Sequence, residues 1–245
     1  MRIAGIEKCS LVDWPGRMAA VVFAPGCNYD CFYCHNRNLL HADAHLDGPS
    51  EAAVLAWLTT RRDYLDGVVV SGGEATLQPG LRTFIGRVRD LGFPIKLDTN
   101  GSRPTVVSRL IDDGLIDYIA MDLKAPAEQY RWVCGPNADI AAVDESIELL
   151  LRDTTDYEFR TTVVPQLTKS DIVAMAKRIQ GARRYILQQY RPQKPTHTND
   201  HTIASPLTDP PHPPTWFTTV LNEISDYVHV CETRGVDTAK VTCAA

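Results

Sequence analysis

The sequence lacks an excess of basic charge and a long apolar run. Lys plus Arg number 25 against 30 Asp plus Glu, which gives the 245 residues a formal net charge of −5. DNA-binding and membrane-surface proteins normally carry a basic excess, so we expect neither a nucleic acid nor a membrane as partner. The apolar run 18–24 is far shorter than the roughly 20 residues of a membrane-spanning helix. Charged residues also interrupt any N-terminal signal-peptide stretch, and we expect a cytoplasmic protein.

The sequence also lacks the even, regularly spaced cysteines of a disulfide framework. It has seven cysteines, and a cytosolic chain of this length needs no disulfides. Four of them are scattered and are predicted to be structural or incidental thiols: Cys9, Cys134, Cys231 and Cys243. The other three crowd into one short segment: Cys27, Cys31 and Cys34. This segment calls for a metal or redox explanation.

The hydrophobic pattern predicts an α/β fold. Apolar residues make up 44% of the chain, enough for an ordinary buried core. Short runs rich in Val and Ile predict buried parallel strands at 19–24, 67–70, 95–98, 118–122, 158–164 and 185–188. Helical patterns fall at 50–62, 81–91, 105–112, 139–151 and 170–179, and Gly92, Gly114 and Gly181 stand where C-terminal glycines belong. The alternation predicts right-handed crossovers in a parallel sheet, either an open doubly wound sheet or an incomplete β/α barrel.

The alternation stops after Tyr190. Residues 191–215 are rich in proline and histidine and hold hardly any apolar side chains, so we expect a loop or lid rather than core. His197 and His201 are four residues apart, but the surrounding prolines favour a solvated loop over a helical metal site. We therefore predict a core over 1–190, the loop or lid at 191–215, and a helix (216–227) and strand (228–231) within 216–245 that complete the same domain.

The three clustered cysteines follow directly on the first predicted strand, through Pro25 and Gly26. Soft thiolate ligands select iron–sulfur clusters or zinc. Three of them can hold three irons of a four-iron cluster and leave the fourth iron open. Zinc with His35 as fourth ligand is the alternative, but adjacent Cys34 and His35 converge poorly on one ion, and structural zinc usually has paired CxxC elements.

The spacing CxxxCxxC resembles the signature of the radical S-adenosylmethionine (SAM) enzymes. The resemblance implies a [4Fe-4S] cluster whose open iron binds the amino and carboxylate groups of SAM. It implies reductive cleavage of SAM to a 5′-deoxyadenosyl radical, which abstracts hydrogen from a substrate. It also implies a partial (β/α)6 TIM-like barrel with parallel strands. Tyr33, the aromatic residue before the third cysteine, fits the family and is assigned to the cofactor site.

A second motif, Ser71-Gly72-Gly73-Glu74, follows the second predicted strand. Two glycines permit close backbone approach, and a carboxylate can accept hydrogen bonds from an ammonium group. By resemblance, Gly72, Gly73 and Glu74 form the GGE motif that binds the methionyl amine of SAM, although Ala75 stands where the family often has proline. Alone, such a turn is usually structural. Its place one β/α unit after the cysteines supports the functional interpretation.

The next two predicted strands end in Asp98-Thr99-Asn100-Gly101 and Asp122-Leu123-Lys124. Both resemble segments of glycyl-radical activating enzymes. The resemblance implies that Asp98 and Asp122 help to form a monovalent cation site beside the SAM carboxylate. It also implies that Thr99 and Lys124 contact SAM. Hard oxygen ligands suit such a cation, and a lysine suits a carboxylate. A turn with an Asx cap is the alternative for the segment at Asp98.

Three further candidates lie on the fifth predicted strand or just after the sixth. Arg160 stands in an apolar strand, where an unpaired arginine is costly, so it is either a SAM contact or half of a structural ion pair. The segment 188–192 ends the sixth strand, and the resemblance implies that Gln189 and Arg191 contact the nucleoside part of SAM.

Four short segments in the first 36 residues resemble one group within the radical SAM enzymes. Residues 10–16 (SLVDWPG), 21–23 (VVF), 26–28 (GCN) and 34–36 (CHN) resemble activating proteins of anaerobic ribonucleoside-triphosphate reductase. The resemblance implies a glycyl-radical enzyme as protein substrate and a flavodoxin- or ferredoxin-type electron donor. No ferredoxin-like insert with further CxxC motifs is present, so we expect a single cluster. Trp14 and Phe23 are expected to be core residues.

Two other functions stay open at this point. A radical SAM enzyme can act on a small molecule or nucleobase, as a 7-carboxy-7-deazaguanine synthase does; such an enzyme should have a closed pocket. A zinc-stabilised binding module without catalysis is the third hypothesis, and it leaves Glu74, Asp98 and Lys124 without a role.

Overall fold

The computed structural model describes residues 1–40, 48–192, 209–236 and 243–244. The chain divides into two compact units. The first unit consists of Met1–Tyr29, Asn36–Asp122 and Asp139–Tyr157, and the second of Asp30–His35, Leu123–Ala138 and Glu158–Ala245.

The first unit is built on a five-stranded sheet. Its strands pair in chain order: β1 (Gly5–Ser10), β2 (Ala19–Ala24), β3 (Gly67–Gly72), β4 (Ile95–Thr99) and β5 (Tyr118–Asp122). β1 is antiparallel to β2, and the pairings from β2 to β5 are parallel. The carboxyl ends of β2 to β5 therefore meet at one edge of the sheet, which is where loops carry function in such folds.

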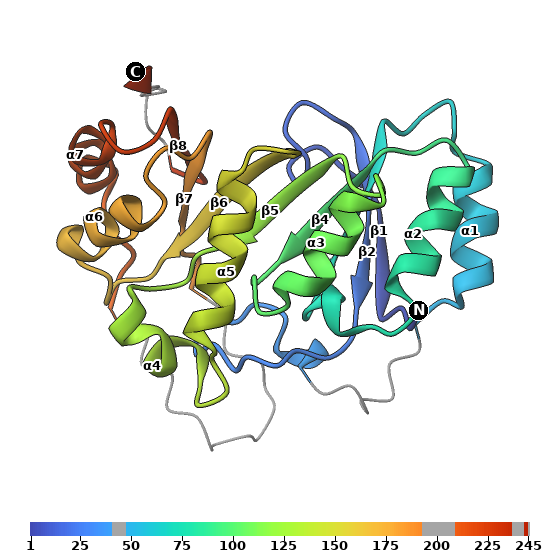
Figure 1. Ribbon diagram of the computed structural model, residues 1–245, viewed down its shortest axis with the longest axis horizontal. Helices are drawn as coiled ribbons and strands as arrows, with labels where there is room; N and C mark the ends of the chain where they lie inside the picture. Colours follow the sequence, from blue (N-terminus) through green and yellow to red (C-terminus); the bar gives the residue numbers. More distant parts are fainter. Residues whose placement is uncertain (41–47, 193–208, 237–242, 245) are drawn as a thin grey trace. The chain divides into compact units, whose positions relative to one another are not determined.

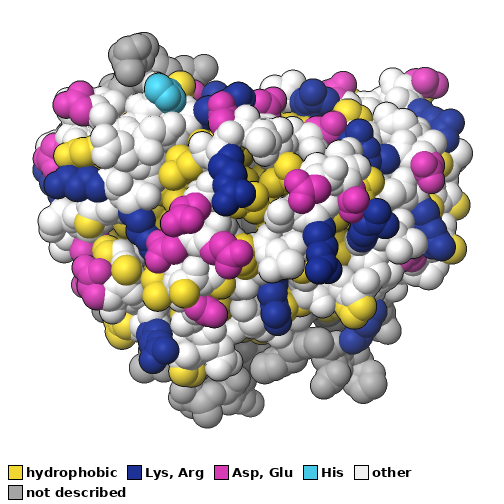
Figure 2. Space-filling model, viewed as in Figure 1, with side chains coloured by type: hydrophobic (Ala, Val, Ile, Leu, Met, Phe, Trp, Pro, Cys, Tyr) yellow, Lys and Arg dark blue, Asp and Glu magenta, His cyan; other side chains and the backbone are white. Residues whose placement is uncertain are grey.

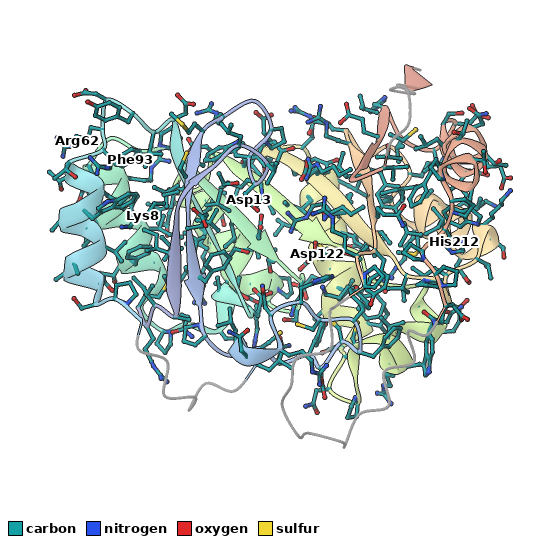
Figure 3. All side chains as sticks on the ribbon, turned by 180° about the vertical axis from the view of Figure 1, so that it is seen from behind. Lys8, Asp13, Arg62, Phe93, Asp122 and His212 are labelled. Atoms are coloured by element: carbon teal, nitrogen blue, oxygen red, sulfur yellow. The ribbon has the colours of Figure 1, made fainter. Side chains whose placement is uncertain are left out.

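Helices α1 (Glu51–Thr59), α2 (Leu81–Asp90), α3 (Pro104–Asp112) and α5 (Ile140–Leu151) lie on one face of this sheet (Figure 1). Seen from behind, β1 and β2 lie in front of them (Figure 3). The short 3-10 helices η1 (Arg37–Leu39) and η2 (Ala75–Leu77) follow β2 and β3.

Local sequence signals explain where these helices begin and end. The Ser50 hydroxyl accepts from the Ala53 amide at 3.2 Å and caps α1. The Asp139 carboxylate caps α5 in the same way. Gly92 and Gly114 follow α2 and α3 with φ of +89° and +65°, the left-handed conformation that glycine adopts without steric cost.

The second unit contains a smaller sheet. β6 (Asp156–Val163), β7 (Tyr185–Gln189) and β8 (Val230–Arg234) pair in parallel, and β9 (Cys243–Ala244) is antiparallel to β8. α6 (Lys169–Arg178) packs against α7 (Pro214–Ile224). α6 begins with a capping box between Thr168 and Asp171. η3 (Ala127–Gln129) and α4 (Tyr130–Cys134) complete the unit.

Apolar side chains fill the sheet interior. Val68, Val69 and Val70 of β3 are fully buried. Trp14 is 3% exposed and packs with Val21 and Val69, which confirms its assignment to the core. A Cβ atom at Gly67 would lie 2.6 Å from the Trp14 ring, so only glycine fits beside it. Phe23 is partly buried against the same cluster.

The α/β class and the parallel pairing of the predicted strands are confirmed within each unit. All six predicted strands are present with shifts of one or two residues at their ends, and the predicted C-terminal strand is β8. The pattern does not predict β1 or α4. Within the second unit, β8 lies parallel to β7 as a further strand after the six β/α units.

No helix in the described ranges is long and apolar enough to cross a membrane. On the face shown in Figure 2, Lys and Arg side chains are interspersed with Asp and Glu. Within the predicted insert, residues 193–208, which include His197 and His201, lie outside the described residues. The loop-or-lid assignment of that segment stays a prediction. At its far end, the His212 ring stacks on Trp216 at the start of α7, with a centroid distance of 4.0 Å.

Candidate cofactor site at the carboxyl ends of the strands

The cysteine segment directly follows β2 in the chain. Cys27 belongs to the first unit, while Cys31 and Cys34 belong to the second. None of the three forms a disulfide. Cys27 and Cys34 are partly exposed and Cys31 is buried. The Cys34 amide donates to the Cys31 carbonyl at 3.0 Å, which closes a tight turn between these two thiols.

Within the second unit, the C-terminal end of α4 holds this segment. The Asp30 amide donates to the Cys134 carbonyl at 2.9 Å, and the Phe32 amide donates to the Val133 carbonyl at 3.2 Å. The Phe32 ring also contacts the Trp132 ring, with centroids 5.0 Å apart. The last carbonyls of a helix lack intrahelical partners, so these hydrogen bonds satisfy α4 and fix the cysteine segment together.

Within the first unit, the Gly72-Gly73 turn lies against the start of the cysteine segment. The Gly73 amide donates to the Ala24 carbonyl at 2.9 Å, and the Glu74 amide donates to the Gly26 carbonyl at 2.8 Å. A Cβ atom on Gly73 would lie 2.1 Å from the Gly26 oxygen, and one on Gly72 would lie 2.3 Å from the Ala24 backbone. Both positions therefore need glycine, as close backbone approach requires.

The Glu74 side chain is 1% exposed and points into the protein. Its Oε1 accepts from the Thr76 amide at 3.1 Å, from the Thr76 hydroxyl and from the Thr99 hydroxyl at 2.9 Å. Its Oε2 accepts from the Asn100 amide at 2.6 Å. Burial raises the pKa of this carboxyl, and the four hydrogen bonds oppose that rise. Glu74 thus links the turn after β3 to the end of β4.

Asn100 lies at the candidate site, although its motif alone predicts no more than a turn. Its Nδ2 donates to the Asn28 side-chain oxygen at 3.1 Å, and the Ser102 hydroxyl donates to the same oxygen at 3.3 Å. Nδ2 also lies 3.9 Å from the Cys27 sulfur. Asn36 is a second such residue, because its Nδ2 donates to the Gly72 carbonyl at 3.1 Å. Asn100 lies within the DTNG motif and Asn36 within the CHN motif. Their positions in these motifs are the sequence feature that could have indicated their place at the site.

The two predicted aspartates stand on neighbouring strands. Asp98 on β4 accepts from the Ser71 hydroxyl at 3.1 Å through Oδ2, and its Oδ1 pairs with the Lys96 ammonium. Asp122 is the last residue of β5 (Figure 3). Lys96 belongs to none of the motifs that predict the site.

In the second unit, the chain after β5 runs beside β6. The Leu123 amide donates to the Arg160 carbonyl at 2.8 Å, and the Thr161 hydroxyl donates to the Leu123 carbonyl at 2.6 Å. The Lys124 amide donates to the Tyr130 hydroxyl at 3.3 Å. The backbone thus brings the predicted residues Lys124 and Arg160 into one neighbourhood.

The end of β7 lies next to the last part of the cysteine segment. The His35 and Tyr190 rings have centroids 6.1 Å apart. Burial, with a smaller effect of the nearby Arg191 guanidinium, lowers the pKa of His35. Gln189 and Arg191 flank Tyr190, so the structure brings this segment close to the residue after Cys34. Tyr33 is buried, and its ring contacts Phe32 edge-on.

The donor set fits an iron–sulfur cluster by its chemistry. Three thiols at CxxxCxxC spacing, none of them in a disulfide, are the soft ligands that such a cluster takes. No group of three His, Cys, Asp or Glu side chains is gathered as a metal-ion site among the described residues. The assignment of the cluster ligands therefore rests on the identity and the spacing of the thiols.

Comparisons with known proteins agree with this chemistry. The chain is 34% identical over 199 residues to a Methanocaldococcus jannaschii protein whose name places it among glycyl-radical enzyme activating enzymes; the match covers 78% of this chain and 80% of that protein. It is 28% identical over 190 residues to the pyruvate formate-lyase-activating enzyme of Clostridium pasteurianum, covering 74% and 77%.

A solved structure has the same fold. The crystal structure of Streptococcus suis SuiB matches with a TM-score of 0.65 at 12% identity, over 88% of this chain and 48% of SuiB. The chain thus spans about half the length of SuiB, and the likeness shows the fold alone. The model of the radical SAM superfamily, which implies a [4Fe-4S] cluster and SAM, matches residues 21–179. The chain therefore belongs to the radical SAM superfamily.

Proposed function

We propose that this radical SAM enzyme activates a glycyl-radical enzyme, with anaerobic ribonucleotide reductase as the partner and a flavodoxin- or ferredoxin-type protein as electron donor. The observation that carries the proposal is the 34% identity to a protein named as a glycyl-radical enzyme activating enzyme, over 78% of this chain. The motif at 10–16 resembles activators of the anaerobic reductase, and it therefore favours this reductase among the possible glycyl-radical partners.

When bound, a reduced cluster would supply the one electron for cleavage of SAM, and the hydrogen abstraction that follows would leave a radical on a partner glycine. Cys27, Cys31 and Cys34 hold the cluster as thiolates. The C-terminal end of α4 keeps Asp30 and Phe32, and with them the loop between the cysteines, in place.

The methionyl ammonium of SAM is held at the Gly72-Gly73-Glu74 turn. Oε2 of Glu74 accepts one hydrogen bond from the Asn100 amide, and a carboxylate oxygen offers two acceptor positions. Because Gly73 lacks a Cβ, the backbone at the turn can approach a ligand closely. Charge-assisted hydrogen bonds of this type are about twice as strong as neutral ones.

The other predicted SAM contacts serve different parts of the cofactor. Lys124 and Arg160 are cations suited to the SAM carboxylate, and the hydrogen bond between their segments keeps them together. Gln189 and Arg191 at the end of β7 contact the nucleoside part, and Tyr33 packs beside the cluster.

The test is anaerobic incubation of reconstituted protein with SAM, a reductant and the candidate reductase. We expect a glycyl-radical signal in electron paramagnetic resonance, with 5′-deoxyadenosine formed alongside. The Cys31→Ala variant is the control and should give neither. Cleavage of SAM without any radical on a glycyl-radical partner, together with turnover of a small molecule or nucleobase, would replace this function by chemistry of the 7-carboxy-7-deazaguanine synthase type.

A further inference from the structure

Lys96 is a lysine in an apolar setting. Its side chain on β4 is fully buried. The register pairs Lys96 with Val69 of β3 and with Tyr118 of β5, which places it on the same sheet face as the cluster around Trp14. Lysine is almost never fully buried unless it is paired, because moving an ammonium group out of water is costly. Its burial therefore needs an explanation in terms of a nearby anion.

That anion is Asp98, two residues further along the same strand. Residues i and i+2 of a strand point to the same face, so the Lys96 stem runs along β4 toward the carboxyl end and its ammonium pairs with Oδ1 of Asp98. The other oxygen, Oδ2, accepts from the Ser71 hydroxyl at 3.1 Å. The Asp98 side chain is 11% exposed, so the pair lies just beneath the edge of the sheet that carries the proposed SAM site.

We propose that the Lys96 ammonium is the resident cation of the Asp98 site, and that this enzyme needs no monovalent metal ion there. The inference rests on the proposed SAM site. The sequence resemblance implies a monovalent cation at Asp98 and Asp122. At Asp98, however, the chain supplies a fixed positive charge from its own strand, and both carboxylate oxygens already have partners.

Electrostatics favours one cation over two at this place. A potassium or sodium ion at Asp98 would either displace the ammonium or lie beside it, and like charges a few ångströms apart repel strongly where water is scarce. The Lys96 ammonium also needs no binding step from solution, because it is part of the chain, whereas taking a metal ion from solution costs free energy. Lys96 is thus a positioning residue, acting on SAM through Asp98.

The direct test is SAM binding to the cluster-loaded wild-type protein, measured by equilibrium dialysis in choline chloride and in potassium chloride at equal ionic strength. We expect the two dissociation constants to agree within about twofold, which is less than the effect of losing one charged contact. A wild-type protein that binds SAM only when potassium or sodium is present would overturn the inference without using any variant.

Lys96→Met is the matched variant, because it keeps the length of the side chain and removes the charge. In choline chloride its SAM affinity should fall about tenfold, the size of a lost charge-assisted contact, and potassium should restore it by occupying the vacated position at Asp98. Ser71→Ala is the control: it removes the neutral partner of Asp98 and should leave SAM binding independent of potassium. A Lys96→Met variant that binds SAM like the wild type in both salts would contradict the proposal.

A readout without SAM or partner separates this inference from the proposed function. In thermal unfolding of the cluster-free protein, potassium in place of choline should raise the midpoint of Lys96→Met and leave the wild type unchanged. Equal responses of both proteins would overturn the role of Lys96. Absence of a glycyl radical on the reductase would overturn the proposed function alone, since neither arm uses the partner.

Discussion

Each residue of the Gly72-Gly73-Glu74 turn has a separate physical task. Gly72 and Gly73 bring the backbone against Ala24 and Gly26 at distances that a Cβ atom would prevent. The Glu74 carboxylate collects donors from Thr76 and from the end of β4. A buried carboxylate is tolerated only when it is hydrogen-bonded in this way. The turn is therefore fixed before any ligand arrives, which lowers the cost of binding.

This arrangement predicts the effect of removing the Glu74 carboxylate. Glu74→Ala should keep the cluster and lose about 1.5–3 kcal/mol of SAM binding, or about tenfold or more in the dissociation constant. The buried Asn100 amide also loses its acceptor in this variant. Thr76→Val removes one donor to Glu74 but keeps the carboxylate, so its SAM affinity should stay closer to the wild type. Equilibrium binding of SAM to both variants measures this difference. An unchanged SAM affinity in Glu74→Ala would mean that the turn is merely structural.

The cysteines give the second prediction at the residue scale. Cys27→Ala, Cys31→Ala and Cys34→Ala should each lose the four-iron cluster, because each removes one of its three thiolate ligands. Iron and sulfide analysis after anaerobic reconstitution measures this loss. Cys9→Ala is the control, since Cys9 is an exposed thiol on β1 and should leave the brown colour intact. Full cluster content in all three loop variants would refute the assignment.

Some of these residues could be predicted from sequence and others could not. The thiols and the glycines follow from spacing and from steric requirements that a motif displays. Lys96 does not, because a lysine in a sequence indicates solvent exposure and only the register with Val69 and Tyr118 reveals its burial. The bonds of Asn100 to Asn28 and Glu74 depend on three loops meeting, which no local pattern encodes.

Among the secondary-structure elements, the predictions succeeded where one periodicity dominates. β2, β3 and β5 are short, mostly apolar runs, and each helix between the strands has a capping residue or a C-terminal glycine at one end at least. β1 was not predicted because Gly5–Ser10 places charged residues in an antiparallel edge strand with mostly exposed or half-exposed side chains. α4 was not predicted because it has only five residues and its packing, rather than its pattern, stabilises it.

α4 is the element that supports the cysteine segment, and it ends at Gly135. Gly135 has φ of +86° and ψ of 172°, a conformation essentially restricted to glycine, and it lies beside Asp30. Gly135→Ala should force this backbone to change and weaken the hydrogen bonds from Asp30 and Phe32 to α4. We expect the cluster of this variant to be lost faster to an iron chelator, as measured by the decay of its visible absorbance.

Gly181→Ala is the matched control for this prediction. Gly181 has φ of +84°, and a Cβ atom there would meet nothing within 4 Å. Both variants should therefore lose stability of order 1–3 kcal/mol from backbone strain, but only Gly135→Ala should change the cluster. Equal rates of cluster loss in the two variants would show that α4 has no particular role in holding the segment.

At the scale of the whole molecule, charge and similarity favour a protein substrate. The net charge is −5, and on the visible face in Figure 2 basic and acidic side chains alternate rather than form one basic surface. Nucleic-acid enzymes depend on such a surface, since phosphate contacts supply most of their affinity. The two named relatives covering about three quarters of the chain are both activating enzymes by name.

The last prediction concerns the origin of the hydrogen atom that 5′-deoxyadenosine receives. If the substrate is a backbone glycine, a reductase partner produced with deuterated glycine should transfer deuterium to 5′-deoxyadenosine, and mass spectrometry of that product measures the transfer. The same partner with its radical-bearing glycine changed to alanine should give unlabelled product and no radical, because the Cβ substituent replaces one of the two transferable hydrogens and removes the deuterium source. Labelled partner glycine with persistently unlabelled 5′-deoxyadenosine, despite full cleavage of SAM, would show that the hydrogen comes from elsewhere. That result would direct the search to small molecules as substrates of the same cluster and SAM site.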